Sequence, residues 1–404
     1  MSTSQENHLP APLKAILCLD DFEEVARRRL PRPLFGYIAG AAERNRSAYA
    51  NRSSFDSYAF VPRVMRDVSK RSTAIELFGQ SYDSPIGIAP MGLSAMMAYR
   101  GDVALAQAAA ASNIPMIMSG SSLIRLEELS AYSPKCWFQA YLPGESEMIR
   151  KLIARVRSAG FKTLVVTVDT PVAANRENNI RTGFSTPLRP SLRLALDGIS
   201  RPRWLLGTLL RTLVNHGMPH FENNHPFRGP PILSRNVERD FSDRGHLSWE
   251  HLSMVRDLWP GSLVLKGVLN AQDAATAVSR GVDGIIVSNH GGRQLDGAIA
   301  PLAVLPEIVG ACPNLPIMID SGIRRGTDVM TAMALGAKCA FVGRPFLYAA
   351  AVGGRRGVQH GIDLLRREVS RNLALIGATT IEELSGKGFL RKLDERDIQR
   401  ASMS

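Results

Sequence analysis

The sequence has few cysteines, and they are scattered. Its 404 residues include four, Cys18, Cys136, Cys312 and Cys339, with no C-x-x-C pair and no spacing typical of metal ligands. Cys136 and Cys339 lie in apolar runs, where a buried thiol is the usual state. A disulfide framework or a cysteine-based metal centre is therefore not expected, and the simplest interpretation is a reducing, cytoplasmic compartment.

Long apolar runs are also absent. No stretch approaches the roughly 18 consecutive apolar residues that a membrane-spanning helix needs. The first residues, MSTSQENHLPAPLKAILCLDDF, lack a basic segment followed by a clear apolar one, so no secretory signal peptide is expected. Neither absence excludes a protein that lies on a membrane surface.

Acidic residues are outnumbered by basic ones. The chain has 49 Lys and Arg against 37 Asp and Glu, which gives a formal charge of +12. Such an excess suits acidic substrates, phosphate groups, nucleic acid or an anionic membrane, and composition does not choose among them. With 45% hydrophobic and 21% charged residues, the chain has the composition of an ordinary soluble globular protein.

From residue 85 onward, short apolar runs rich in β-formers alternate with helical stretches. The runs are continuous rather than alternating, which is typical of parallel strands covered by helices. They lie at 85–90, 115–120, 136–142, 163–169, 263–268, 284–290, 316–322 and 339–345. Eight repeats in about 270 residues predict an α/β fold, a (β/α)₈ TIM barrel. A doubly wound sheet is the alternative, but the Gly-rich fingerprint expected after its first strand is missing.

Three parts are predicted along the chain. Residues 1–84 form an N-terminal helical extension, 85–385 the barrel with a long insert at 187–244 after the fourth strand, and 386–404 a C-terminal tail. Within the insert, RPRWLLGTLLRTLVNHG (201–217) combines leucines with arginines. A basic amphipathic segment of this kind can lie in a membrane interface, or it can be a helical lid packed on its own protein. Both interpretations stay open.

Chemically versatile side chains gather where the predicted strands end. In a TIM barrel the active site lies at the C-terminal ends of the strands. The residues found there are Met91, Gly92, Ser119, Gln139, Tyr141, Thr167, Asp169, Lys266, Ser288, His290, Asp320, Gly343 and Arg344.

Five separate motifs carry a family resemblance, which runs in order from about residue 20 to residue 385. They resemble the FMN-dependent L-2-hydroxy acid dehydrogenases and oxidases, the family of L-lactate dehydrogenase, mandelate dehydrogenase and glycolate oxidase. The resemblance implies bound FMN and oxidation of an L-2-hydroxy acid to its 2-oxo acid. The motifs are TVDTP (167–171), LKGV (265–268), SNHGGRQLD (288–296), DSGIRRGTDV (320–329) and VGRP (342–345).

The resemblance implies a catalytic set. His290 would be the base, because its pKa lies near working pH. Asp169 would orient His290 and stabilise its protonated form. Tyr141 would bond the region of the substrate hydroxyl, and Lys266 would stabilise negative charge on the reduced flavin.

The substrate residues implied by the resemblance include two arginines. Arg293 and Arg176 would bind the substrate carboxylate, for which a guanidinium has the right geometry. The match at Arg176 is weaker, because Ala174 stands where the family commonly has glycine. Tyr37 would contact the carboxylate from the N-terminal extension.

The same resemblance places the cofactor. The flavin-binding residues would be Pro90, Met91, Gly92, Ser119, Gln139, Thr167, Lys266, Ser288, Asp320, Gly322, Arg324, Gly343 and Arg344. Five of these lie at or just after the ends of the seventh and eighth strands, where a TIM barrel commonly binds phosphate: Asp320, Gly322, Arg324, Gly343 and Arg344.

Two positions bear on the subtype. Gly92 is similar to the small residue of the dehydrogenases, and Ser121 stands where glycolate oxidase has tryptophan, so L-lactate or a larger acid such as mandelate is expected to fit. No haem-binding cytochrome domain is expected at the N-terminus, and the insert is basic. Both points favour a quinone acceptor, reached through peripheral contact of 187–235 with the inner face of the cytoplasmic membrane. An oxidase that releases H₂O₂ is the alternative, and a non-redox FMN isomerase is a more distant one.

The sequence also bears on oligomeric state, nucleic-acid binding and metal binding. The family resemblance implies a homotetramer. Nucleic-acid binding explains the basic charge no better than the anions above and is not expected. His216, His220 and His225 hint at metal spacing, but they lie in the variable insert without supporting ligands, so no metal site is predicted.

Overall fold

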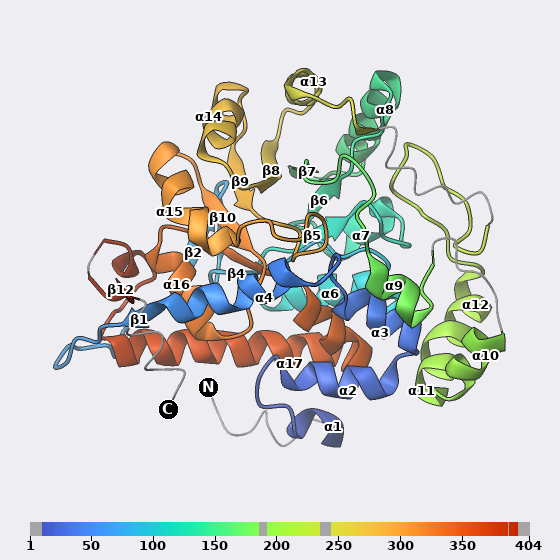
Figure 1. The fold of residues 1–404 in the computed structure, drawn as a ribbon, viewed down its shortest axis with the longest axis horizontal. Coiled ribbons are helices and arrows are strands. Elements are labelled where there is room, and N and C mark those ends of the chain that lie inside the picture. The colour runs from blue at the N-terminus through green and yellow to red at the C-terminus, as the bar shows by residue number, and fades with distance from the viewer. Residues whose placement is uncertain (1–9, 186–191, 235–243, 387, 395–404) are drawn as a thin grey trace.

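Eight parallel strands close into a barrel in the computed structural model, which describes residues 10–185, 192–234, 244–386 and 388–394 (Figure 1). The sheet order is β4-β11-β10-β9-β8-β7-β6-β5, and a parallel bridge between Ile88 and Met116 joins its two edges. The predicted (β/α)₈ fold is confirmed, and each of the eight predicted runs coincides with one of these strands, although β8 begins one residue before its run. They are β4 (Ile86–Ile88), β5 (Ile117–Ser119), β6 (Trp137–Ala140), β7 (Thr163–Thr167), β8 (Ser262–Val268), β9 (Gly284–Val287), β10 (Ile317–Asp320) and β11 (Ala340–Val342).

The barrel strands form the centre of the hydrophobic core. Every residue of seven of them is buried, and β8 departs from this only at two half-buried positions. Burial on both faces explains why the runs are continuously apolar. It also makes Lys266, Ser119 and Gln139 conspicuous, because polar groups this deep need partners.

Helices cover the outside of the barrel (Figure 1). The helical stretches expected between the apolar runs are present as helices in the structure. α17 is 33 residues long and is kinked at Gly354, whose φ and ψ of 56° and −141° are not helical. The covering helices are α6 (Gly101–Ala111), α7 (Leu126–Tyr132), α8 (Ser146–Ser158), α13 (Trp249–Leu258), α14 (Ala271–Ser279), α15 (Pro301–Ala311), α16 (Gly326–Ala334) and α17 (Arg344–Ile376).

The segment before the barrel is largely helical and packs on α17. A hairpin of β2 and β3 lies at the N-terminal ends of the strands, where the Phe78 ring meets Trp137 at 5.4 Å between centroids. The C-terminal ends of the barrel strands are not covered by this hairpin and remain available to a ligand. The elements are α1 (Ala11–Lys14), α2 (Asp21–Arg29), α3 (Arg32–Ala39), α4 (Arg46–Ser53), η2 (Ser54–Ser57), β1 (Tyr58–Phe60), β2 (Ile75–Leu77), β3 (Gln80–Tyr82) and, just after β4, α5 (Ser94–Met97).

The two ends of the chain are joined by a short antiparallel sheet. β12 (Leu390–Lys392) pairs with β1, and the 3₁₀ helix η5 (Glu382–Leu384) precedes it. β12 lies in the predicted tail, so part of 386–404 is bound to the extension. The division into extension, barrel and tail stays a prediction.

After β7 the chain forms α9 (Glu177–Thr182), and the insert then contains α10 (Leu192–Ile199), α11 (Pro202–Trp204), the π-helical η3 (Leu205–Leu210) and α12 (Arg211–His216). The last four lie at one end of the molecule near α2 and α3 (Figure 1), where the Arg32 amide donates to Asp197. Residues 186–191 and 235–243 of the predicted insert lie outside the described residues. Across the described ranges, no helix is both long and apolar enough to cross a membrane.

Candidate active site

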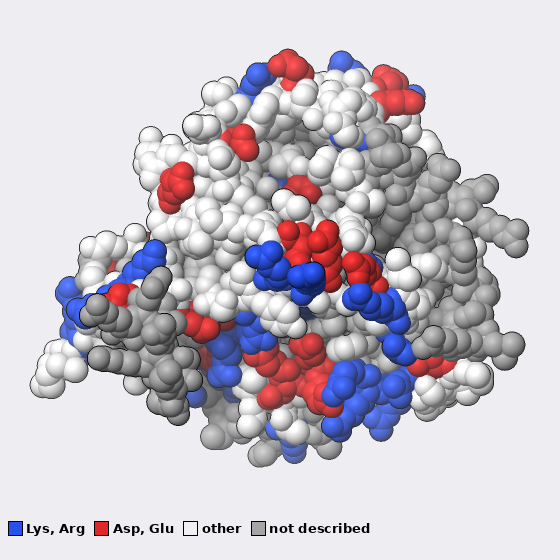
Figure 2. Space-filling model, viewed as in Figure 1, with Lys and Arg blue, Asp and Glu red and all other residues white. Residues whose placement is uncertain are grey.

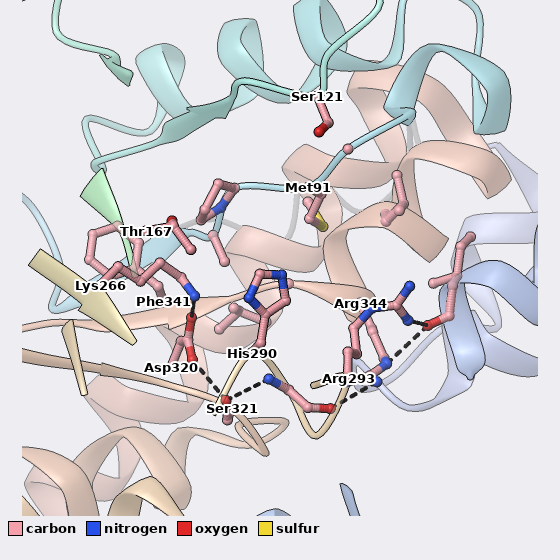
Figure 3. A pocket seen from close by; sticks show the side chains of 18 of the residues that line it. Met91, Ser121, Thr167, Lys266, His290, Arg293, Asp320, Ser321, Phe341 and Arg344 are labelled. Atoms are coloured by element: carbon pink, nitrogen blue, oxygen red, sulfur yellow. Dashed lines mark hydrogen bonds and ion pairs between the residues drawn. The ribbon is translucent and has the colours of Figure 1, made fainter. Parts of the chain in front are cut away.

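A cavity of about 140 Å³ lies at the C-terminal ends of the barrel strands (Figure 3). Parallel strands bring these ends together, so residues far apart in sequence meet there. Four predicted site residues, Ser119, Gln139, Asp169 and Ser288, stand behind its wall. The other predicted residues line the cavity: Tyr37, Pro90, Met91, Gly92, Ser121, Tyr141, Thr167, Arg176, Lys266, His290, Arg293, Asp320, Gly322, Arg324, Gly343 and Arg344.

His290 and Asp169 form a largely buried pair at the cavity, with side chains 18% and 11% exposed. His290 Nδ1 lies 2.8 Å from Asp169 Oδ1, and the backbone of His290 has a φ of +58°, which is uncommon for a residue other than glycine. With Nδ1 bonded to the carboxylate, Nε2 is the nitrogen left for the cavity. Tyr141 Oη lies 3.5 Å from Nε2.

The protonation of this pair follows from burial and charge. Burial lowers the pKa of His290 below its ordinary value, although Asp169 opposes the shift. Burial pushes the pKa of Asp169 upward, but His290 and Lys266 outweigh that effect and hold it below its ordinary value. Burial raises the pKa of Tyr141. At neutral pH the site therefore holds a neutral imidazole, a carboxylate and a protonated phenol.

A second buried pair lies deeper in the barrel. Lys266 Nζ is 3.1 Å from Asp320 Oδ2, with side chains 4% and 8% exposed, and it donates to Ser288 Oγ at 2.9 Å. Burial alone would lower the pKa of Lys266, but Asp320 and Asp169 outweigh it and raise that pKa. A positive charge is thus held at the cavity wall (Figure 3).

Two buried polar atoms on the barrel strands have no hydrogen-bond partner among the described residues. They are Gln139 Nε2 and Thr167 Oγ1; the other end of the Gln139 amide accepts from Ser119 Oγ at 3.2 Å. Buried polar groups are nearly always bonded. A ligand with a polar edge would supply the missing partners.

Two buried arginines meet at the far end of the cavity. Burial, aided by nearby Arg324, lowers the pKa of Arg344 to about 10; burial and nearby Arg52 lower the pKa of Arg324. Both remain charged at neutral pH. Like charges held together away from water suit an anionic ligand such as phosphate.

The remaining two arginines are anchored by backbone and amide groups. Arg293 Nη1 donates to Gly40 O at 2.6 Å, and its guanidinium lies 5.0 Å from the centre of the Tyr37 ring. Arg176 donates to Arg293 O at 3.0 Å and to Gln294 Oε1 at 2.6 Å. The structure thus brings together all three side chains predicted to bind a carboxylate.

The sequence reasoning missed several residues that hold the site in place. Asn51 and Asn289 exchange hydrogen bonds of 2.8 and 2.6 Å between the extension and the loop after β9. Gln294 donates to Asp169 O at 3.1 Å, and Ser321 Oγ donates to Asp320 at 2.8 Å. Gln294 and Ser321 lie inside the motifs at 288–296 and 320–329, so their place in the site could have been predicted from the sequence. Asn51 lies in no motif, and the sequence gives no sign of its role.

The insert histidines are bound elsewhere. His216 Nε2 lies 2.9 Å from Tyr99 Oη, and His220 Nδ1 lies 2.9 Å from Gly229 O. Among the described residues, no group of three or more His, Cys, Asp or Glu side chains is placed to hold a metal ion.

Comparison with known proteins agrees with this geometry. Residues 26–391 match the family described as FMN-dependent dehydrogenase. The chain belongs to this family. It is an enzyme with FMN as its cofactor, so the resemblance stated from the motifs is confirmed. The polar atoms of Gln139 and Thr167 that have no partner among the described residues, and the neighbouring cations Arg324 and Arg344, fit that cofactor.

Individual relatives are similar over nearly the whole chain. The (S)-mandelate dehydrogenase of Pseudomonas putida is 37% identical, over 91% of this chain and 92% of its own. An L-lactate dehydrogenase of Xanthomonas campestris is 38% identical, over 95% and 99%. The crystal structure of monotopic membrane protein (S)-mandelate dehydrogenase has a TM-score of 0.84 at 35% identity, over 94% of this chain and 100% of that one. A mandelate oxidase structure scores 0.76 at 31% identity, over 92% and 97%.

Proposed function

We propose that this enzyme oxidises an L-2-hydroxy acid to the 2-oxo acid, with His290 as the base. L-lactate is the first candidate substrate, and a larger acid such as mandelate the second. The observation that carries the proposal is the buried His290–Asp169 pair at 2.8 Å, with Nε2 on the cavity side and guanidinium groups near it. Relatives named as lactate and mandelate dehydrogenases support it.

Each residue has a role that its contacts support. Arg176 and Arg293 bind the substrate carboxylate, with Tyr37 beside them. His290 Nε2 removes a proton from the substrate, and Asp169 stabilises the imidazolium that results. Tyr141, held protonated by burial, donates to the substrate oxygen.

Bound FMN would supply the acceptor for the two electrons of the substrate and for the proton that His290 does not take. Lys266 supplies positive charge for the flavin's polar edge, and Gln139 and Thr167 offer it their unpartnered atoms. Arg324 and Arg344 would hold the phosphate. The backbone of Pro90, Met91 and Gly92 would contact the flavin ring, and Ser119, Ser288, Asp320, Gly322 and Gly343 would complete the cofactor site.

The wall beside Gly92 supports a substrate larger than glycolate. Ser121 is small, and its Oγ donates to Asn224 Oδ1 at 3.3 Å. A Cβ at position 92 would lie 3.0 Å from Ser121 Cβ and 3.4 Å from Tyr37 Oη. The glycine therefore keeps space open between these two side chains.

In this proposal the electrons pass to a quinone. The enzyme reaches it through peripheral contact of the insert with the inner face of the cytoplasmic membrane. Large apolar side chains are exposed on its helices: Leu206 by 63%, Val214 by 82% and Leu196 by 62%. Such side chains are rarely exposed together without a partner surface. The monotopic nature of the similar mandelate dehydrogenase agrees with membrane contact, and the homotetramer expected from the resemblance belongs to the same proposal.

The test is anaerobic mixing of the FMN-loaded protein with L-lactate and, separately, L-mandelate, followed by flavin absorbance. We expect bleaching, then fast reoxidation by a soluble quinone analogue and slow reoxidation by air. Rapid reoxidation by air with peroxide would replace the dehydrogenase by an oxidase. No bleaching with any L-2-hydroxy acid would refute the proposed reaction. Unchanged vesicle binding and quinone reduction after deletion of 200–215 would refute the membrane role.

A further inference from the structure

A second cavity, of about 590 Å³, lies between α2, α5, α6, the insert and the kink of α17. We call it the arginine cavity, because five arginines from separate elements line it and no Asp or Glu among the described residues does. They are Arg29, Arg100, Arg203, Arg211 and Arg355. It is separate from the active site, whose lining it does not share.

Most of these charges are not balanced by a carboxylate. Only Arg100 forms an ion pair among the described residues, with Glu128, and its own Nε is buried without a partner there. In the part of the chain that the structure describes, Arg29 donates a hydrogen bond only to Ala351 O, at 3.5 Å, and the Arg211 guanidinium lies 4.0 Å from the centre of the Tyr99 ring.

Repulsion between the arginines is already visible at Arg29. Burial, and then the nearby charge of Arg203, lower the pKa of the Arg29 guanidinium. A negative ligand would remove this repulsion. The kink at Gly354 adds to the attraction, because the second helical segment of α17 begins beside the cavity and the start of a helix favours anions.

We propose that the arginine cavity binds the phosphate group of a phosphate ester. Guanidinium groups from different elements can donate to different oxygens of one phosphate. A single guanidinium can also bond two of those oxygens, in the bidentate geometry that arginine favours. The volume exceeds what a bare phosphate needs. Tyr99, Tyr132 and Trp204 form a wall for the organic part, and Trp204 is fixed by its Nε1 bond to Met96 O at 2.8 Å.

Two sources share this chemistry, a phospholipid headgroup and a soluble phosphate ester. The exposed Leu206 and Leu210 stand on η3, the helix that contributes Gly207 and Thr208 to the cavity. A lipid would place its phosphate among the arginines and its chains along these leucines. The site goes beyond the proposed oxidation, which it does not require.

The test uses the FMN-loaded protein, so that the cofactor's own phosphate site is filled. One arm measures co-sedimentation with phosphatidylcholine vesicles that contain phosphatidylglycerol or, at equal charge, oleate. The other measures calorimetric binding of glycerol 3-phosphate and inorganic phosphate. The cavity variant is Arg29→Gln with Arg203→Gln. Its control is Arg27→Gln with Arg28→Gln, the same charge change on the exposed side of α2, where both arginines pair with Glu24. Figure 2 shows basic and acidic side chains intermixed on the face of the molecule that carries α2.

We expect the cavity variant to weaken binding by roughly tenfold for each arginine, the usual scale of a lost hydrogen bond to a charged group. The control should stay near the unmodified protein, and melting temperatures should match. A loss confined to phosphatidylglycerol vesicles assigns a lipid headgroup, and a loss in calorimetry assigns a soluble ester. Equal losses in both variants, equal effects on oleate vesicles, or no phosphate binding in either arm would overturn the proposal.

A third variant separates this site from the proposed membrane contact. Leu206→Ser with Val214→Ser removes exposed apolar surface and leaves the five arginines. If it alone abolishes vesicle binding while the cavity variant changes nothing, the membrane contact stands and the phosphate site is refuted. If glycerol 3-phosphate binding is lost in the cavity variant and no vesicles bind, the phosphate site stands and the membrane contact fails.

Discussion

Replacement of Asp169 by asparagine tests the proposed base most directly. His290 Nδ1 lies 2.8 Å from Asp169 Oδ1, and the two side chains are 18% and 11% exposed. When His290 takes up the substrate proton, the carboxylate faces a full positive charge. An asparagine keeps the shape but removes that charge, and its amide can also favour the wrong imidazole tautomer.

The size of the effect follows from Coulomb's law. Charge centres about 4 Å apart at an effective dielectric constant of about 20 attract by about 4 kcal/mol. Each 1.36 kcal/mol of lost transition-state stabilisation lowers the rate tenfold. We therefore expect kcat of Asp169→Asn to fall by roughly a thousandfold, measured by steady-state oxidation with a soluble quinone analogue.

The pH profile gives a second, independent readout. His290 must be neutral to act as a base, so kcat/KM rises as pH passes its pKa, which burial places below the ordinary value. Asp169 is the group that opposes this lowering. Its removal should therefore move the acid limb of the profile to still lower pH, even though the rate falls.

The control is Asp257→Asn, at an exposed position of α13, which should leave both quantities unchanged. A loss of less than roughly tenfold would contradict the charge-stabilisation argument. An acid limb that moves to higher pH would contradict the assignment of His290 as the titrating base.

Three further substitutions test the cofactor site and the substrate wall. Lys266→Met leaves Asp320 buried without its cation, so the free energy of unfolding in urea should fall by about 3 kcal/mol; a loss below about 1 kcal/mol would speak against a buried ion pair. Gly92→Ala places a methyl group 3.0 Å from Ser121 Cβ, and kcat/KM should fall roughly tenfold more for L-mandelate than for L-lactate; equal losses would contradict a steric cause. Gly322→Ala puts a Cβ 2.1 Å from Asn51 O at a φ of +90°, so both the melting temperature and the retention of FMN should fall. The control Gly310→Ala, in open space on α15, should raise the melting temperature slightly. A Gly322→Ala variant with unchanged melting temperature and FMN retention would refute the close approach.

The barrel could be predicted because its signal is local and repeated. Each strand is buried on both faces, so each reads as a short continuous apolar run, and eight runs leave few alternatives. The site followed from this, because parallel strands place their C-terminal ends together. Thus Asp169 and His290, 121 positions apart, form one hydrogen bond.

Other features depend on contacts that have no local signature. The pairing of β1 with β12 joins segments from opposite ends of the chain, and short strands of this kind have little sequence pattern. α15 contains Pro306, which argues against a helix when read locally. The bond between Ser121 and Asn224 depends on how the insert folds back over the barrel, which spacing along the chain does not determine.

The extension does more for the site than contribute Tyr37. The carbonyl groups of Ile38 and Gly40, at the end of α3, accept hydrogen bonds from both Arg293 and Arg344, the arginines assigned to two different anions. Arg344 uses Nε and Nη2 for these bonds and a third to Gly291 O. A guanidinium has five N–H donors, so Nη1 can bond a phosphate oxygen while the carbonyls fix its plane. The backbone at the end of α3 thus orients the cations for both anions, and a disturbance there should weaken substrate and cofactor binding together without removing any charge.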